Sequence, residues 1–133
     1  MIRYEFTEQV APAALADLRA AVGWNRMERD LSDPSMRNTI HLCAFDDGHL
    51  IGYAAVVGNG VTDAYIQDAM VHPCYQRHGV GTQLMKRVLA RLEQDGIYMV
   101  SAIYGEEALR PFYERFGFHT MLCGQREMRP GRD

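Results

Sequence analysis

The sequence lacks the features that are typical of secreted proteins, of membrane-spanning proteins and of proteins with a structural zinc site. Its three cysteines, Cys43, Cys74 and Cys123, are an odd, scattered set without CxxC spacing. This argues against a disulfide framework or a structural zinc site and favours a reducing compartment. No apolar run approaches the roughly 18 residues that a membrane-spanning helix needs, and no basic segment followed by an apolar core opens the chain. We therefore expect a cytoplasmic protein that is not associated with a membrane.

A strong charge of either sign is also missing. The formal net charge is −3 and the pI about 5.9, so the whole molecule has no general attraction to nucleic acid. The acids are unevenly distributed, however, because no Asp or Glu occurs between Ala69 and Leu92, where four Lys or Arg residues fall. The alternative is a solvated basic helix face. The glycines within this stretch favour instead a site for a polyanionic ligand.

The 133 residues and the ordinary hydrophobic content of 47% predict one domain over residues 1–133 with a core of its own. Apolar spacing and turn residues predict the order β-α-α-β-β-β-α-β-α-β, which is a mixed α/β sheet. A strand, helix and strand across 63–103 predict a right-handed parallel crossover. The expected strands cover 2–7, 39–45, 50–57, 63–71, 97–103 and 118–128; the expected helices cover 12–22, parts of 25–38, 79–94 and 111–116.

Two of these segments carry further expectations. The run 97–103 is almost wholly apolar, which is typical of a strand covered on both faces. The long polar connection 25–38 is a candidate wall for a substrate site, because long connections in compact domains are often functional.

The most informative stretch is a loop that opens the helix over 79–94. It runs from the end of a strand through Pro73 to Gly79 and Gly81. The first amides of a helix have no partner within it, and the helix macrodipole adds about half a positive charge there. Glycines let a ligand approach the backbone closely, so this loop is a candidate phosphate site.

Three motifs in this order resemble the GCN5-related N-acetyltransferase (GNAT) family. The segment 76–81, QRHGVG, matches that family's acyl-CoA loop, Gln/Arg-x-x-Gly-x-Gly/Ala, at every specified position. The segment 69–73, AMVHP, matches the strand end and proline-containing loop before it. The segment 112–118, FYERFGF, matches the short helix and Gly-Phe turn near the C-terminus. The resemblance covers about residues 39–128.

The resemblance implies a GNAT fold, in which a mostly antiparallel, twisted sheet with helices on both faces splays into a V between two central parallel strands. Acyl-CoA would lie in that gap as the co-substrate, with its pantetheine arm along the strand end and its pyrophosphate on the glycine loop. No metal is implied, and since many members dimerise, a homodimer is a further expectation. The implied cofactor contacts are Met70, Val71, Gln76, Arg77, His78, Gly79, Val80, Gly81, Thr82, Phe112 and Tyr113.

The activity implied by the resemblance is transfer of an acetyl group from acetyl-CoA to a primary amine, by direct attack in a ternary complex. Tyr113 matches the family's tyrosine acid near the sulfur, and the backbone N–H of Val71 would stabilise the oxyanion. Asp68 is the first choice for a base, although strand alternation places it and Val71 on opposite faces unless a bulge intervenes. The implied acceptor is a small molecule or a peptide amine.

Several alternatives accompany this assignment. A module of the same fold that senses acyl-CoA without turnover fits the same motifs, whereas a P-loop is disfavoured because Gly79-Val80-Gly81 is not followed by Gly-Lys-Ser/Thr. Cys74 has no identifiable base beside it to make it a nucleophile, and the loop residues His72 and His78 default to solvated side chains. The family's frequent Asn after the 97–103 strand is replaced here by Tyr104 and Gly105. Residues that could line the acceptor pocket are Trp24, Tyr53, Tyr65 and Tyr104.

Overall fold

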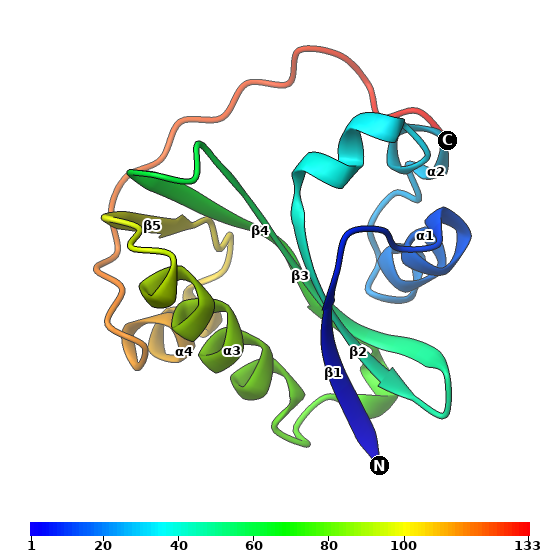
Figure 1. The fold of residues 1–133 in the computed structure, drawn as a ribbon, viewed down its shortest axis with the longest axis horizontal. Helices are drawn as coiled ribbons and strands as arrows, with labels where there is room; N and C mark the ends of the chain where they lie inside the picture. The colour runs from blue at the N-terminus through cyan, green and yellow to red at the C-terminus, as the bar shows by residue number, and fades with distance from the viewer.

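The chain is organised around one five-stranded sheet with the strand order β1-β2-β3-β4-β5, seen in a computed structural model that describes residues 1–133 (Figure 1). Neighbouring strands are antiparallel except β4 and β5, which are parallel. None of the helices is both long and apolar enough to span a bilayer. The strands are β1 (Ile2–Thr7), β2 (Ile40–Asp46), β3 (His49–Gly58), β4 (Asp63–Val71) and β5 (Met99–Ala102). The helices are α1 (Pro12–Ala21), α2 (Glu28–Leu31), α3 (Val80–Gln94) and α4 (Arg110–Glu114), with short 3-10 turns η1 (Pro34–Asn38), η2 (Pro73–Tyr75) and η3 (Glu107–Leu109).

Turn chemistry places most of these elements where the sequence predicts them. Asp47 and Gly48 both adopt positive φ, 50° and 80°, as the two-residue hairpin between β2 and β3 requires. Gly23, with φ 87°, follows the end of α1. Pro111 lies in the first turn of α4, where its missing N–H costs nothing. The connection 25–38 forms the two short helical pieces that the sequence indicates, α2 and η1.

The sheet separates two layers of apolar side chains. Helices α3 and α4 cover one face and α1 and α2 the other (Figure 1). The larger cluster packs the apolar face of α3, including Leu84, Val88 and Leu92, against β2, β3 and β4. The smaller cluster packs Leu15 and Leu18 of α1 on the opposite face. The mixed sheet with helices on both faces is therefore confirmed.

The parallel pair β4 and β5 is paired over only four residues of each strand. Their register runs from Asp63 opposite Met99 to Ile66 opposite Ala102, after which β5 ends and β4 continues to Val71. The edge of β4 that faces β5 is consequently without a strand partner from Gln67 to Val71. This is the V-shaped opening that the resemblance implies.

The strand expected over 97–103 is shorter and less covered than predicted. β5 spans Met99–Ala102 and is the edge strand of the sheet, with Met99 47% exposed. The apolar run indicated burial on both faces, but the face that carries Met99 and Ser101 is exposed. Tyr98 and Ile103, which flank β5, are exposed as well. The prediction of a strand covered on both faces is therefore wrong.

The final strand expected over 118–128 is also wrong. Phe118 packs against Tyr113, but from His119 to Met128 the chain is exposed, contains no strand and makes no backbone hydrogen bond. Both ends of this segment are held by side chains elsewhere. The Tyr104 and Thr120 hydroxyls are hydrogen-bonded at 2.6 Å at one end, and Asp30 binds Arg129 and Arg132 at the other. We call residues 119–128 the C-terminal strap; it passes from α4 to α2 instead of following β5 (Figure 1).

Close packing of α3 on β3 depends on the absence of a side chain at Gly52. A Cβ at this position would lie 3.0 Å from Val80 Cγ1, 3.1 Å from Ala44 Cβ and 3.3 Å from Leu84 Cδ1. We expect Gly52→Ala to lower the free energy of unfolding by about 1–3 kcal/mol through overpacking, measured by urea denaturation. Gly124→Ala is the control, because a Cβ there meets nothing within 4 Å. Equal stability of the two variants would contradict this account of the helix–sheet contact.

Candidate active site

A bulge in β4 shapes the middle of the splayed region. Tyr53 of β3 lies opposite Met70, but Ala55 lies opposite Gln67, so β4 has one extra residue between these pairs. Asp68 is at this point and has a φ of 54°, unusual for a residue other than glycine. A bulge between Asp68 and Val71, which the sequence analysis required if the two residues are to serve one site, is therefore present.

The bulge turns the carboxylate of Asp68 toward helix α1. Its Oδ2 accepts a hydrogen bond of 2.8 Å from Nη1 of Arg19, and the Asp68 side chain is 25% exposed. No hydrogen bond to Oδ1 is formed within the chain. Asp68 is thus held through one oxygen, and the other is free to meet a ligand or water.

The loop after β4 is fixed by its own side chains. The N–H of His72 donates to the carbonyl of Ile51 at 2.7 Å, and Nδ1 of His72 accepts from the N–H of Cys74 at 3.1 Å. Nε2 of Gln76 donates to the carbonyl of Val71 at 3.1 Å. His72 therefore caps the η2 turn, and Gln76 ties the glycine loop back to the end of β4.

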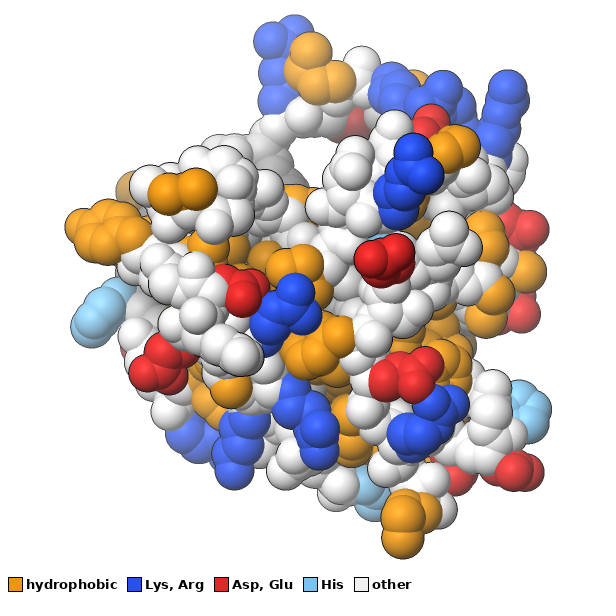
Figure 2. All heavy atoms as spheres, in the orientation of Figure 1, with side chains coloured by type: hydrophobic (Ala, Val, Ile, Leu, Met, Phe, Trp, Pro, Cys, Tyr) orange, Lys and Arg blue, Asp and Glu red, His pale blue; other side chains and the backbone are white.

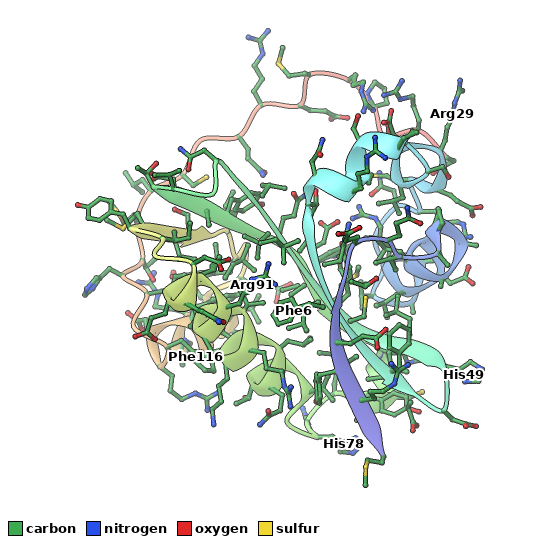
Figure 3. The ribbon with its side chains drawn as sticks, in the orientation of Figure 1. Phe6, Arg29, His49, His78, Arg91 and Phe116 are labelled. Carbon is green, nitrogen blue, oxygen red and sulfur yellow. The ribbon has the colours of Figure 1, made fainter.

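The start of α3 presents free backbone amides. Gly79 precedes the helix with a φ of 80°, no side chain caps the first turn, and that turn contains no acid. Arg77 also adopts positive φ, 67°, so two residues of the loop, Arg77 and Gly79, are in the left-handed region. His78 lies in this exposed loop at the N-terminal end of α3 (Figure 3). Oriented amides of this kind bind phosphate groups well.

The two arginines farther along α3 lie against rings of β1. The guanidinium of Arg87 lies 4.5 Å from the centre of the Tyr4 ring, and that of Arg91 lies 5.1 Å from Phe6, both on β1. Figure 3 shows Arg91 and Phe6 close together, and Figure 2 shows Lys and Arg side chains dispersed over this face instead of gathered in one patch. Among the basic residues of the acid-free stretch, Arg77 alone belongs to the glycine loop.

Tyr113 is at the centre of an aromatic cluster on α4. Its ring stacks on Tyr104 with centroids 4.4 Å apart and meets the edges of Phe112 and Phe118. Burial of the ring, and to a smaller extent the neighbouring Tyr104 and Tyr65, raise the pKa of Tyr113 above that of an ordinary tyrosine. Its hydroxyl makes no hydrogen bond within the chain, and no fully buried side-chain polar atom is left without a partner. The Tyr113 hydroxyl therefore reaches solvent with its proton in place.

Three motifs that are far apart in the sequence converge at Gly81. A Cβ placed on Gly81 would lie 3.8 Å from the ring of Phe112 and 3.8 Å from Cγ2 of Val71. The strand end, the glycine loop and the α4 helix thus meet at one point, beside the unpaired edge of β4. An elongated molecule with phosphates at one end fits this arrangement, with its phosphates at the α3 amides and its other end toward Tyr113.

The candidate acceptor-site aromatics separate into two groups. Trp24 is 42% exposed and lies 5.4 Å from the guanidinium of Arg19, and Tyr65 is half-buried on β4. Burial, with a smaller effect of Asp68, raises the pKa of Tyr65. Tyr53 is instead a core residue, 1% exposed and hydrogen-bonded to His41, so it does not line a pocket.

Part of the long 25–38 connection borders a separate hollow. This hollow has a volume of about 290 Å³ and lies between the β1–α1 connection and residues 31–37, with His41 in its wall. It shares no residue with the convergence at Gly81. No group of three or more His, Cys, Asp or Glu side chains is arranged to hold a metal ion.

His41, in the wall of this hollow, makes the free energy of unfolding depend on pH. Burial lowers the pKa of its imidazole, which is hydrogen-bonded to Tyr53 and to the carbonyl of Met36. The unfolded chain then binds the proton more readily, so stability is fully present above about pH 6.5 and falls as the pH drops toward the folded pKa. We expect His41→Asn to lose less stability than the wild type between pH 7.5 and pH 5.5 in urea unfolding. Equal losses would show that His41 does not control this range.

Arg19 is the site residue that sequence reasoning missed. It is 7% exposed and lies on the buried side of α1 next to Leu15 and Leu18. The signal was an arginine four residues after Leu15, within the apolar face of the predicted helix. A basic residue at such a position indicates a buried partner, which here is Asp68.

The comparisons with known proteins concern the family and the fold. The sequence profile described as "Acetyltransferase (GNAT) family" matches residues 5–118, so the chain belongs to the GNAT family. It is 32% identical over 119 residues to the uncharacterized N-acetyltransferase ycf52-like of Prochlorococcus marinus, covering 84% of this chain and 64% of that protein. The chain thus spans a little under two thirds of this curated relative.

Solved structures give the same fold. A GNAT-family acetyltransferase of Streptococcus pneumoniae superposes with a TM-score of 0.74 at 29% identity, over 96% of this chain and all of that one. A predicted acetyltransferase of Clostridium acetobutylicum, whose structure is described as containing acetyl-CoA, superposes with a TM-score of 0.72 at 16% identity, over 91% and 92% of the two chains. At that identity the second likeness concerns the fold alone.

Proposed function

We propose that this protein is an N-acetyltransferase that transfers an acetyl group from acetyl-CoA to a primary amine of a small molecule or peptide. The observation that carries the proposal is the convergence of Val71, Phe112 and the glycine loop at Gly81, with the ring of Tyr113 centred 5.2 Å from that of Phe112. Membership of the GNAT family and the free amides at the start of α3 support acetyl-CoA as the co-substrate.

In the proposed complex, the pantetheine arm adds to the unpaired edge of β4 as a further strand would, through backbone groups of Met70 and Val71. The pyrophosphate lies on the amides of residues 76–82. Holding both substrates in one cleft supplies proximity, which can remove about 7–11 kcal/mol from the barrier of a bimolecular step.

The chemistry follows from the groups around that cleft. The neutral amine attacks the thioester carbonyl, and the N–H of Val71 stabilises the negative charge that develops on its oxygen. The carbon–sulfur bond then breaks, and the thiolate takes the proton of the Tyr113 hydroxyl, which its raised pKa keeps protonated at neutral pH. The proton of the attacking nitrogen leaves through water, for which the free Oδ1 of Asp68 is the proposed acceptor. Tyr113 regains its proton from solvent.

The test is an acceptor-dependence assay. Purified protein is incubated with acetyl-CoA and a panel of aliphatic amines, arylalkylamines, polyamines and peptides, and free CoA thiol is followed over time. We expect thiol release that requires one class of amine. Saturable acetyl-CoA binding without acceptor-dependent release across the panel would instead identify a sensor of acyl-CoA. Thermal stabilisation by ATP but not by acetyl-CoA would overturn both assignments.

A further inference from the structure

Arg19 connects the active-site bulge to the loop after α1. Its guanidinium donates from Nη1 to Asp68 at 2.8 Å, from Nε to the carbonyl of Asn25 at 2.6 Å and from Nη2 to Oδ1 of Asn25 at 2.8 Å. Nη2 also contacts Sδ of Met27 at 3.3 Å, and the indole of Trp24 lies beside the group. All three nitrogens of this buried guanidinium thus contact a neighbour, and these contacts fix its position.

The bulge needs such support. A non-glycine residue in the left-handed region costs of the order of 1 kcal/mol or more and persists when its surroundings hold it there. Asp68 has a φ of 54°, and the hydrogen bond from Arg19 is the one that its side chain accepts within the chain. The extra residue of the bulge also sets the direction in which Met70 and Val71 leave it. Movement at Asp68 would therefore reach the proposed oxyanion donor.

The loop that holds Arg19 is itself held by the C-terminus of the chain. The N–H of Met27 donates to Asp133 at 3.1 Å, and a Cβ on Gly131 would lie only 2.7 Å from Nδ2 of Asn25. The end of the chain therefore fits closely against residues 25–27. Figure 1 shows the C-terminus beside α2, far in sequence from the elements that it touches.

A second carboxylate, that of Asp30, also fastens this end. Asp30 of α2 accepts from Nη2 of Arg129 at 2.8 Å, and from the backbone N and Nε of Arg132 at 2.8 and 2.9 Å. These hydrogen bonds, of which the one from Arg129 has the largest effect, hold the pKa of Asp30 well below its usual range. We call Asp30, Arg129 and Arg132 the C-terminal clamp. The strap before the clamp makes no backbone hydrogen bond, and Figure 2 shows an opening beneath it.

We propose that Arg19 is a positioning residue for acetyl transfer, and that the C-terminal clamp keeps Arg19 in place through Asn25 and Met27. Arg19 acts by holding the Asp68 bulge in the conformation that aims Val71 and the free oxygen of Asp68 at the reacting atoms. This inference rests on the proposed function. The proposal adds a series of contacts that runs from residues 129–133 through Asn25 and Met27 to Arg19 and Asp68.

Arginine is needed here because the N–H groups of its planar guanidinium donate hydrogen bonds to several acceptors at once. Lysine keeps the charge but offers a compact ammonium, which cannot reach Asp68 and both oxygens of Asn25 together. Arg19→Lys should consequently lower kcat by about tenfold, because misplacement of about 1 Å at a reacting centre costs up to a hundredfold. The KM for acetyl-CoA should stay within about threefold, since the glycine loop and α3 are untouched.

The experiment compares Arg19→Lys, the double variant Arg129→Gln/Arg132→Gln, their combination, and a control. The control is Arg26→Gln, because Arg26 lies between Asn25 and Met27 but pairs with Asp17 and Glu28 on the outside of the loop. We expect the clamp variant to lower kcat less than Arg19→Lys does. The combination should be no slower than Arg19→Lys alone, because both changes act along one line of contacts. Arg26→Gln should retain the wild-type kcat.

Backbone amide exchange at residues 66–72, measured with acetyl-CoA present, is the second readout. It should accelerate in Arg19→Lys and in the clamp variant, but not in the control. Wild-type kcat in Arg19→Lys, or an increase in exchange that is uniform over the chain, would overturn the proposal. If the wild type itself shows no turnover with any amine, the proposed function fails; unchanged exchange at 66–72 in Arg19→Lys would then separately refute the support of the bulge by Arg19.

Discussion

Replacing Tyr113 with phenylalanine lowers kcat by about a hundredfold or more, because a positioned general acid contributes about 10²- to 10⁴-fold to a proton transfer. The substitution keeps the ring that stacks on Tyr104 and removes only a hydroxyl without a partner in the chain, so the fold should be unaffected. Affinity for acetyl-CoA should remain within a few-fold. Steady-state kinetics with the best amine of the panel, together with acetyl-CoA titration, measures the two effects separately.

Tyr104→Phe is the matched control for this variant. It removes the other hydroxyl of the stacked pair, which bonds to Thr120 and not to the cleft, and should leave kcat within a few-fold. Because burial raises the pKa of Tyr113, the acid should stay protonated, and kcat should show no falling limb from this group between pH 6 and pH 9. A Tyr113→Phe enzyme as fast as the wild type across that range would remove Tyr113 from the mechanism.

Replacing Gly81 with valine should weaken acetyl-CoA binding by about ten- to a hundredfold. The branched side chain would extend from a Cβ that already touches Phe112 and Val71 and would crowd the proposed acetyl-CoA site where these residues meet the glycine loop. Each charge-assisted hydrogen bond that is lost costs about 1.5–3 kcal/mol. Isothermal titration with acetyl-CoA measures the change.

Gly81→Ala separates the binding effect from a folding effect. Its Cβ would be in ordinary contact with Phe112 and Val71 at 3.8 Å, and alanine favours helix over glycine by about 1 kcal/mol. This control should fold at least as stably as the wild type and bind acetyl-CoA with an affinity close to it. Wild-type affinity in Gly81→Val would overturn the assignment of the loop as the phosphate site.

Local sequence signals predicted the parts of the structure that local chemistry decides. Asp47-Gly48 specified a hairpin because few other residue pairs accept two positive φ angles in succession. The apolar spacing of Leu84, Val88 and Leu92 specified one face of α3, and the glycines at its N-terminal end specified a helix start that a ligand can approach. These motifs were sufficient to indicate the fold and the cofactor region.

The features that sequence reasoning could not place depend on contacts between distant residues. The sequence could not predict the bulge at Asp68. The residue that binds the Asp68 carboxylate, Arg19, lies 49 positions earlier in the chain. The apolar run 97–103 indicated burial, but the face of β5 that carries Met99 and Ser101 is exposed, because no distant segment packs over it. Residues 118–128 also form no strand along the outer edge of β5. The composition of residues 118–128 is typical of a strand, but side-chain contacts at the two ends of the strap hold this segment away from the sheet.

The C-terminal strap has a consequence for how this protein could diversify. Because its middle makes no backbone hydrogen bond and both fastenings lie at its ends, residues can be inserted or exchanged there without disturbing the sheet. Such changes would leave the two hydrophobic clusters as they are. Natural variation or directed evolution could therefore change the length and composition of this segment with little loss of stability.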